Sequence, residues 1–369
     1  MSELALKLIQ ENRQHYKKGD ISYKKLDLGR CGLSKIPEEI FENIWLEELI
    51  LCNEWLNYKK KIWINSKNKG HKNNLSLLPY GLVNMRNLRI LRCNGDYNDN
   101  WQISKLENLP LTLNHLDISS NQIQKLENLP QSLNQLDISD NKIQKLENLP
   151  LTLTELKIYS NQIRKLENLP QNLTKLKIYS NQIQKLENLP LTLNQLDISY
   201  NKIQKLENLP QSLNQLDISD NQIQKLENLP QNLNELDISD NQIQKLENLP
   251  LNLNELDISS NQIQKLENLP LSLNQFDIRD NKISNITPLK DLIIIKGLNI
   301  SWERKTSGII LENNPLTTPP PEIVKKGREA VLRYFEDIEE TGVDFLYEAK
   351  LLIVGEPGAG KTSLYRKLV

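Results

Sequence analysis

The sequence is poor in several features, and each shortage excludes a class of protein. Basic and acidic residues nearly balance, giving a formal net charge of −1 and a pI near 6.4. No overall basic field therefore favours nucleic acid as a partner. No apolar run approaches the ~18 residues of a membrane span, and the N-terminus lacks the apolar core of a signal peptide. We therefore expect a protein with no membrane span and no nucleic-acid partner.

Cysteine is also scarce. The chain has three cysteines, Cys31, Cys52 and Cys93, and their spacing is irregular. This pattern fits neither a zinc site nor an even-numbered disulfide framework. Free thiols persist in reducing compartments, so we expect a cytoplasmic protein.

The most abundant feature of the sequence is a twenty-residue repeat unit that recurs almost unchanged. Asparagine recurs nine times at a spacing of twenty, from Asn121 to Asn281, and proline does the same from Pro110 to Pro270. A fixed period of this length with the pattern L-x-x-L-x-L-x-x-N is the signature of leucine-rich repeats. The period predicts an α/β leucine-rich-repeat solenoid with short parallel strands on its concave face.

The residues of one unit explain the period. Leu116 and Ile118 alternate with polar residues, which is typical of a half-buried strand. Other apolar positions of the unit also point inward, and one coil cannot bury them without its neighbours. Asn121 comes where the chain leaves the strand, so its amide can pair with backbone groups of the turn. Pro130 favours an extended rather than helical return side.

The rest of the chain is divided around this array. We predict an N-terminal capping helix, divergent repeats, regular repeats, irregular closing repeats, a linker or capping helix and the start of a GTPase domain. The capping helix is expected over 1–19, the divergent repeats over 20–103 and the regular repeats over 104–283. The closing repeats follow over 284–320, the linker or capping helix over 321–342 and the start of the GTPase domain over 345–369. A polar insertion at about 58–74 interrupts the divergent repeats as a loop. It can be a binding loop or a disordered excursion.

One motif carries chemistry. A short apolar run, 349–354, precedes the pattern G-x-x-x-x-G-K-[ST] at 355–362. Such a loop wraps phosphate with backbone N–H groups, its lysine reaches the β- and γ-phosphates, and its threonine binds Mg²⁺. The candidate phosphate-binding residues are Gly355, Gly358, Gly360, Lys361, Thr362 and Ser363, with Thr362 as the Mg²⁺ ligand. No catalytic residue is assigned.

The same C-terminal residues carry a resemblance. Leucine-rich repeats, then the segment from Asn314 through Phe335, then the phosphate loop, resemble the junction of Roco proteins. The resemblance covers about 20–369 in architecture and 313–366 in detail. It implies GTP and Mg²⁺ as cofactors, a Ras-like Roc domain, and GTP hydrolysis where that domain is complete. The repeat unit also resembles those of bacterial secreted effectors, without their downstream ligase domain.

The chain ends at Val369, before the rest of a Roc domain and before the family's COR dimerisation domain. We therefore expect no nucleotide binding or hydrolysis by this chain as given. Two functions stay open: a stand-alone leucine-rich-repeat binding module, or the front part of a complete Roco GTPase, with or without a further catalytic domain.

A few substitutions stand out in the array. Aspartate occupies one strand position in most units, but Lys157 and Lys177 replace it in two. Tyrosines lie close by, and tyrosine is common in contact patches. The candidate partner-binding residues are Lys157, Tyr159, Lys175, Lys177, Tyr179 and Tyr200. The alternative is that Lys157 and Lys177 only relieve repulsion between stacked aspartates.

These substitutions lead to a prediction about the ligand. We expect a protein or peptide on the concave face, with an acidic or phosphorylated centre and flanking basic residues. The three tyrosine rings are expected within roughly 5 to 10 Å of one another on adjacent strands. The predicted function is a protein-interaction scaffold that leads into a Roc-type GTPase.

Overall fold

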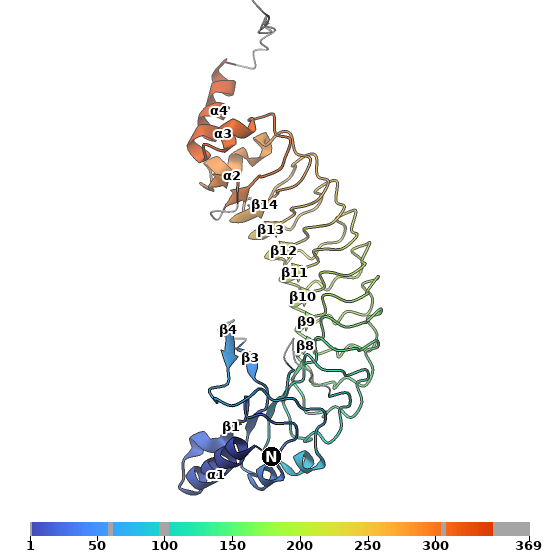
Figure 1. Cartoon of the computed structure of the whole chain (residues 1–369). Coiled ribbons are helices and arrows are strands. Elements are labelled where there is room, and N and C mark those ends of the chain that lie inside the picture. The colour runs from blue at the N-terminus through green and yellow to red at the C-terminus, as the bar shows by residue number, and fades with distance from the viewer. Residues whose placement is uncertain (1, 58–61, 96–102, 304–307, 342–369) are drawn as a thin grey trace, which may run out of the picture.

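The computed structural model describes residues 2–57, 62–95, 103–303 and 308–341, and within these ranges the chain forms one curved solenoid (Figure 1). Fourteen strands form one parallel sheet along its hollow side. The sheet begins with β1 (Lys25–Asp27), β2 (Glu48–Ile50) and β5 (Ile90–Arg92). Nine strands follow at the twenty-residue period: β6 (His115–Asp117), β7 (Gln135–Asp137), β8 (Glu155–Lys157), β9 (Lys175–Lys177), β10 (Gln195–Asp197), β11 (Gln215–Asp217), β12 (Glu235–Asp237), β13 (Glu255–Asp257) and β14 (Gln275–Asp277). The sheet ends with β16 (Ile309–Ile310) and β15 (Ile300–Ser301).

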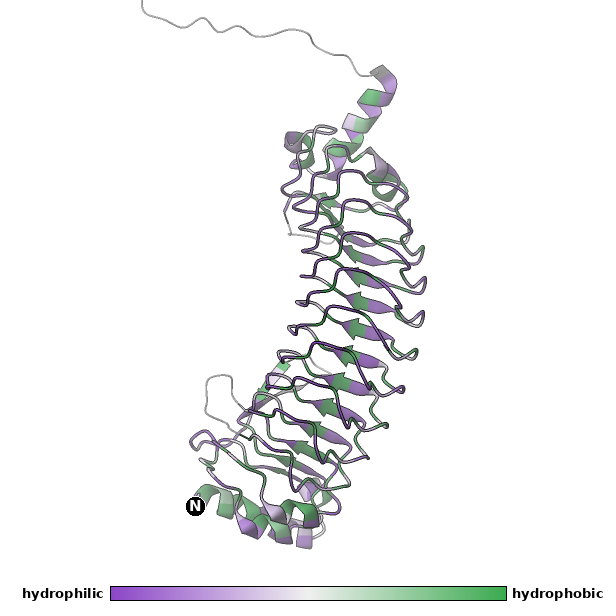
Figure 2. Ribbon diagram, turned by 90° about the vertical axis from the view of Figure 1, so that its right-hand side faces the viewer, coloured by the Kyte–Doolittle hydropathy of each residue, from purple (hydrophilic) through white to green (hydrophobic). Residues whose placement is uncertain are grey.

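Equivalent residues of successive units lie side by side. Leu196 of β10 pairs with Leu176 of β9 and with Leu216 of β11, and the same register holds through the array. The central leucine of β6 to β13 points into the coil and is buried, as are Phe276 at the same position of β14 and the isoleucine two residues later, such as Ile198. Hydrophobic and hydrophilic residues alternate along each strand (Figure 2). One continuous apolar core therefore runs through the stack, which no single unit could bury alone.

The repeated asparagine holds neighbouring coils together. Nδ2 of Asn201 donates to the carbonyl oxygens of Ser199 and Ile198 in its own unit and of Ile178 in the previous unit, at 3.0, 3.1 and 3.2 Å. Its Oδ1 accepts from the backbone N–H of Ile183 at 2.9 Å. The sequence predicted that this amide pairs with backbone groups of the turn, and the bonds confirm it.

Each regular coil also contains two left-handed turns. The residue before the ladder asparagine and the asparagine of the Leu-Glu-Asn-Leu-Pro segment have positive φ, for example 52° at Ser180 and 56° at Asn188. Asparagine, aspartate and serine fill almost all of these positions, and short polar side chains tolerate this conformation best. The return side is therefore extended, with no helix in the nine regular units.

The N-terminal end is closed by helix α1 (Glu3–Lys17), capped by Ser2. Ala5 and Ile9 are buried on the first coil, and Tyr16 stacks on Trp45 at 4.6 Å between ring centroids. This agrees with the expected cap. Single turns of 3₁₀ helix follow it along the chain: η1 (Ile21–Lys24), η2 (Glu38–Glu42), η3 (Tyr80–Asn84) and, beyond the array, η4 (Thr287–Leu289).

The insertion after β2 differs from the expected polar loop. Strands β3 (Glu54–Asn57) and β4 (Ile62–Asn65) form an antiparallel hairpin that projects on the hollow side (Figure 1). Asn73 then returns to the core, is fully buried, and donates to the carbonyls of Leu28 and Leu51. It does what the ladder asparagine does in regular units. Periodicity did not reveal this because Asn73 lies outside the twenty-residue spacing.

The C-terminal end is closed by three short helices. They are α2 (Lys290–Ile294), α3 (Pro321–Val324) and α4 (Arg328–Thr341). The linker or capping helix expected over 321–342 is divided into α3 and α4, because Gly327 has a φ of 90° and interrupts it. Val324, Val331 and Phe335 cover the last coil. In the described ranges the fold is thus a parallel β-solenoid with few helices, and the predicted Ras-like strand, 349–354, lies outside them.

Candidate functional site

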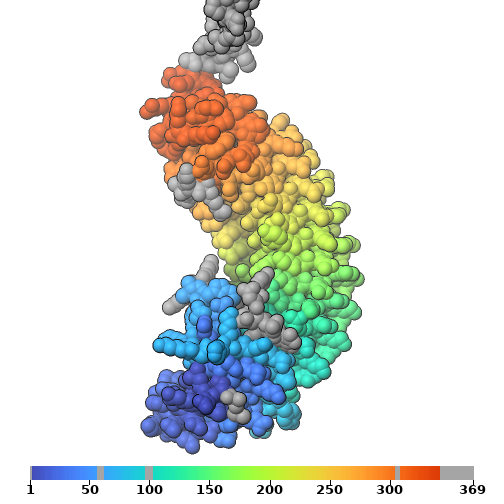
Figure 3. All heavy atoms as spheres, viewed as in Figure 1, coloured from blue at the N-terminus to red at the C-terminus, as the bar shows by residue number. Residues whose placement is uncertain are grey.

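The hollow side of the solenoid contains an open groove. Its volume is about 1390 Å³, and its floor runs from Gln135 on β7 to Ile310 on β16. Figure 3 shows the hollow beside the middle of the chain. The floor is made of the outward-facing residues of each strand, so every unit contributes one rung. Substitutions between units therefore change the groove locally and leave the core unchanged.

Two tyrosines form the aromatic part of the groove. The rings of Tyr159 and Tyr179 stack with centroids 4.3 Å apart and planes 5° from parallel. Burial and the nearby Asp137 raise the pKa of Tyr159, while burial and Asp197 raise the pKa of Tyr179 to about 12. Both phenols therefore stay neutral at physiological pH and offer apolar area with a polar tip.

The three candidate lysines have different surroundings. Lys157 is buried and its Nζ lies 3.2 Å from Oε1 of Glu155; burial lowers its pKa, although Asp137 opposes this. Lys175 and Lys177 are exposed, with Nζ of Lys177 at 4.0 Å from Oδ2 of Asp197. Lys157 is thus paired with a glutamate of its own strand, and the alternative that Lys157 and Lys177 only relieve repulsion between stacked aspartates stays a prediction. Lys175 and Lys177 face the groove.

Tyr200 does not join the tyrosine stack. It follows Ser199, the residue equivalent to Tyr179, and so lies one position farther along the chain, in a left-handed turn with a φ of 51°. Its side chain is exposed, and its hydroxyl is hydrogen-bonded to Asp220 of the next unit, which raises the pKa of Tyr200. The expectation of three clustered rings is therefore correct for two of them. The sequence pattern alone did not distinguish the position of Tyr200 from that of Ser199, although the two residues lie differently at this turn.

Toward the C-terminal half, the groove floor becomes acidic. Asp217, Asp237 and Asp257 occupy equivalent positions on consecutive strands, and burial raises the pKa of each, with further raising by neighbouring aspartates. Oδ1 of each carboxylate accepts from the serine two residues later; for Asp237 the distances are 3.0 Å from N and 2.7 Å from Oγ of Ser239. These carboxylates therefore have fixed orientations along the groove.

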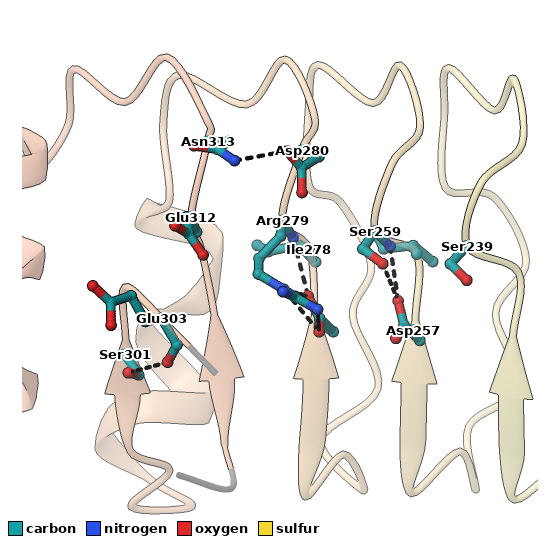
Figure 4. Close-up of polar contacts among 12 residues, drawn as sticks. Ser239, Asp257, Ser259, Ile278, Arg279, Asp280, Ser301, Glu303, Glu312 and Asn313 are labelled. Atoms are coloured by element: carbon teal, nitrogen blue, oxygen red, sulfur yellow. Dashed lines mark hydrogen bonds and ion pairs between the residues drawn. The ribbon is translucent and has the colours of Figure 1, made fainter. Parts of the chain in front are cut away.

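An arginine ends this acidic series. Arg279 replaces the serine of the repeat, and its guanidinium binds both carboxylate oxygens of Asp277, with Nη2 at 2.8 Å from Oδ2 (Figure 4). Beside it, Asn313 donates to Asp280 at 2.8 Å. In the sequence, Arg279 is visible as a break in the serine pattern of the repeat.

A buried ionisable cluster at the other end was missed from sequence. Arg92 Nη1 lies 3.2 Å from Nε2 of His115, whose Nδ1 lies 2.8 Å from Oε1 of Gln135. Arginine can only donate, so Nε2 accepts, Nδ1 carries the proton, and the imidazole is neutral. Burial lowers the pKa of His115 accordingly. Nearby, burial and then Asp137 raise the pKa of Asp117 to about 7.

The residues of the predicted nucleotide site lie beyond the C-terminal helix α4 (Arg328–Thr341). Gly355, Gly358, Gly360, Lys361, Thr362 and Ser363 all lie outside the described residues. Within the described ranges, no group of three or more histidines, cysteines, aspartates or glutamates is placed to hold a metal ion. In the same ranges, no helix is long and apolar enough to cross a membrane.

Comparison with known proteins supports the solenoid. A leucine-rich-repeat family model matches residues 110–125 and 230–245. YopM from Yersinia enterocolitica WA-314 superimposes with a TM-score of 0.56 and 28% identity, over 87% of this chain and 75% of that one. An internalin from Listeria monocytogenes gives a TM-score of 0.57 at 23% identity, over 77% and 92% of the two chains, and shows the fold alone.

A curated relative matches a short stretch. The probable serine/threonine-protein kinase pats1 of Dictyostelium discoideum is 43% identical over 58 residues, which are 16% of this chain and 2% of that protein. The match thus spans a very small part of the relative's length. The family model and the structural matches support the architecture, a leucine-rich-repeat solenoid of stacked coils.

Proposed function

We propose that this leucine-rich-repeat solenoid, a protein-interaction scaffold, binds its protein partner in the concave groove. The observation that carries the proposal is the open floor of β9 to β13, where exposed lysines and a stacked tyrosine adjoin fixed carboxylates. On the groove floor the units differ in charge and aromatic content, because Lys175, Lys177 and Tyr179 of β9 stand where β10 has glutamine, aspartate and serine. Tyrosine and complementary charge are common at protein interfaces.

The test is affinity capture from cell extract with a groove variant. Lys175→Gln, Lys177→Asp and Tyr179→Ser together convert the β9 strand to the sequence of its β10 neighbour, so the fold should be kept. The matched control, Lys165→Gln with Lys185→Asp, changes the net charge equally on the outer surface, where both lysines are exposed. We expect the bound proteins to be lost with the groove variant and retained with the control. An unchanged set with the groove variant contradicts the proposal.

For the C-terminal segment we propose a Roc-type role, supported by the motif at 355–362 and by its resemblance to Roco proteins. Lys361 would bind the β- and γ-phosphates of GTP, and Thr362 would bind Mg²⁺. Bound Mg²⁺ would neutralise charge on the phosphates. The test is binding of a fluorescent GTP analogue to a chain that contains the whole nucleotide-binding domain. Lys361→Ala should abolish it, and equal binding by that variant contradicts the role.

A cytoplasmic location belongs to the same proposal. Cys31, Cys52 and Cys93 are free and buried, and burial raises the pKa of each thiol, to about 12 for Cys31. Such thiols are inert and suit a reducing compartment. Localisation of a tagged protein in intact cells tests this.

A further inference from the structure

The charges along the groove are compensated unevenly. At one end, Lys177 lies 4.0 Å from Asp197, and at the other Arg279 binds Asp277. Asp217, Asp237 and Asp257, between them, have no ion pair within the described residues. The chain thus supplies its own cations at both ends of the series and leaves three carboxylates in the middle.

These three carboxylates are also organised for a ligand. Oδ1 of each is held by a serine, and no hydrogen bond to Oδ2 is formed within the described residues. Burial and mutual repulsion raise their pKa values, so placing cations beside them would relieve an existing cost. Because the groups are already oriented, little entropy is lost when a partner binds.

We propose that the groove takes an α-helix of the partner protein, with basic residues every third or fourth position over Asp217–Asp257 and an acidic residue beside Lys175 and Lys177. This inference deepens the proposed function and rests on it. The order of charges along the groove gives the polarity of the helix: two exposed lysines lie at the β9 end, and three carboxylates without an ion pair in the described residues follow. Asp137 and Lys157 are buried, so an acidic centre flanked by bases on both sides does not fit.

The spacing favours a helix over an extended segment. Neighbouring strands are ~4.8 Å apart, so three rungs of carboxylates span ~10 Å. A helix places same-face side chains every ~5.4 Å, so three basic residues span ~11 Å. An extended chain places them every ~6.7 Å and spans ~13 Å, which is nearly one rung too long. The mismatch grows with each further contact along the groove.

The groove is long enough for such a helix. From β8 to β14 there are six strand spacings, about 29 Å, which corresponds to about 19 helical residues. The volume of about 1390 Å³ is open on one side, so the helix would lie partly sunk in the hollow with its outer face in solvent. The stacked ring of Tyr179 would contact aliphatic side chains near the acidic end of the helix.

Synthetic peptides provide the probe. The block peptide is a 20-residue alanine-based helix with two glutamates at one end and three lysines at helical spacing farther along. The interleaved peptide has the same composition and helicity, with the charges alternating. A third peptide carries prolines that abolish the helix. We expect the block peptide to bind about tenfold tighter than the other two by fluorescence anisotropy in 0.15 M salt, as three exposed ion pairs allow.

Variants of the protein locate the site. Asp217→Asn, Asp237→Asn and Asp257→Asn together should weaken the block peptide about tenfold. The charge-matched control is Glu207→Gln, Glu227→Gln and Glu247→Gln, in an exposed row outside the groove. This control should bind the block peptide like wild type. Circular dichroism checks that both variants are folded.

Each outcome of these experiments supports or overturns the proposed helix. Equal affinity for the block and interleaved peptides, or equal weakening by the control variant, overturns the inference. Equal affinity for the proline peptide shows an extended occupant and also overturns the helix. Failure of these peptides while the β9 groove variant still loses captured partners refutes only the helix. Failure of both experiments refutes the proposed function as well.

Discussion

The asparagine ladder predicts an unusual pattern of coupling between substitutions. Asn201→Ala removes four hydrogen bonds, but most of their partners keep another one. The carbonyl of Ile178 still accepts from Asn181, that of Ile198 from Asn221, and that of Ser199 from the N–H of Ser180. The number of hydrogen bonds removed therefore overstates the expected loss of stability.

One backbone group loses the only hydrogen-bond partner that it has among the described residues. The N–H of Ile183 donates to Oδ1 of Asn201 at 2.9 Å, and Asn201→Ala leaves it buried and unpaired. Such a group costs about 1–3 kcal/mol, and the small void adds to this, so we expect a loss of about 2–4 kcal/mol in the free energy of unfolding. The measurement is urea unfolding followed by circular dichroism.

A double substitution shows whether the sharing is real. The carbonyl of Ile178 accepts only from Asn181 and Asn201 among the described residues, at 3.1 and 3.2 Å. Removing both asparagines leaves it unpaired as well, so the adjacent pair should cost about 1–2 kcal/mol more than the sum of the singles. Asn181→Ala with Asn221→Ala shares no carbonyl and should be additive.

The two doubles have the same composition and differ only in whether the units are neighbours. Equal coupling in both, or none in either, would refute the shared-carbonyl account. Repeat arrays can lose cooperativity, so the denaturant slope of each variant must equal that of wild type for the comparison to hold. A changed slope would instead indicate partial unfolding at the substituted units.

Three further predictions concern single residues. Tyr200→Asn should raise the free energy of unfolding by about 0.5–1 kcal/mol, because asparagine tolerates the left-handed turn better than tyrosine; a loss measured by urea unfolding contradicts this. Asp117 has a pKa raised to about 7, so its contribution to stability is present below about pH 4 and lost as pH rises through 7. Asp117→Asn should flatten that part of the stability profile, and an unchanged slope refutes the assignment. Ile198→Asp should cost several kcal/mol because Ile198 is fully buried, whereas Gln195→Asp should stay within about 0.5; equal shifts in Tm contradict the assigned orientation.

The repeated part of the fold could be predicted from sequence because each unit repeats the same local rules. Leu196, Ile198 and Asn201 recur at fixed spacing, and the structure places their equivalents in the core and the ladder throughout. The hairpin of β3 and β4 and the return of Asn73 could not be predicted in this way. They occur once, so no second copy shows which of their residues point inward.

The candidate site could be predicted only in part for a related reason. The repeat pattern showed where Tyr159 and Tyr179 differ from their neighbours, and these rings do stack. Exposure was harder, because the burial of Lys157 and His115 depends on packing that the repeat unit does not specify. The position of Tyr200 was harder still to predict. It follows the residue equivalent to Tyr179, and its positive φ places it in a left-handed turn, apart from the stacked rings.

The near identity of the units has a consequence for how the chain finds its structure. A unit can stack on one two places away with the same leucines, the same shared carbonyls and the same turns, leaving the skipped unit as a loop. Such misaligned stacks lack little more than the contacts of one unit compared with the native stack. The entropic cost of closing the loop grows only slowly with its length. The native alignment is therefore selected where the copies stop, at α1 and the divergent coils on one side and at α2 to α4 on the other. Truncating either end should therefore first yield folded solenoids with different numbers of stacked units, and only then unfolded chains.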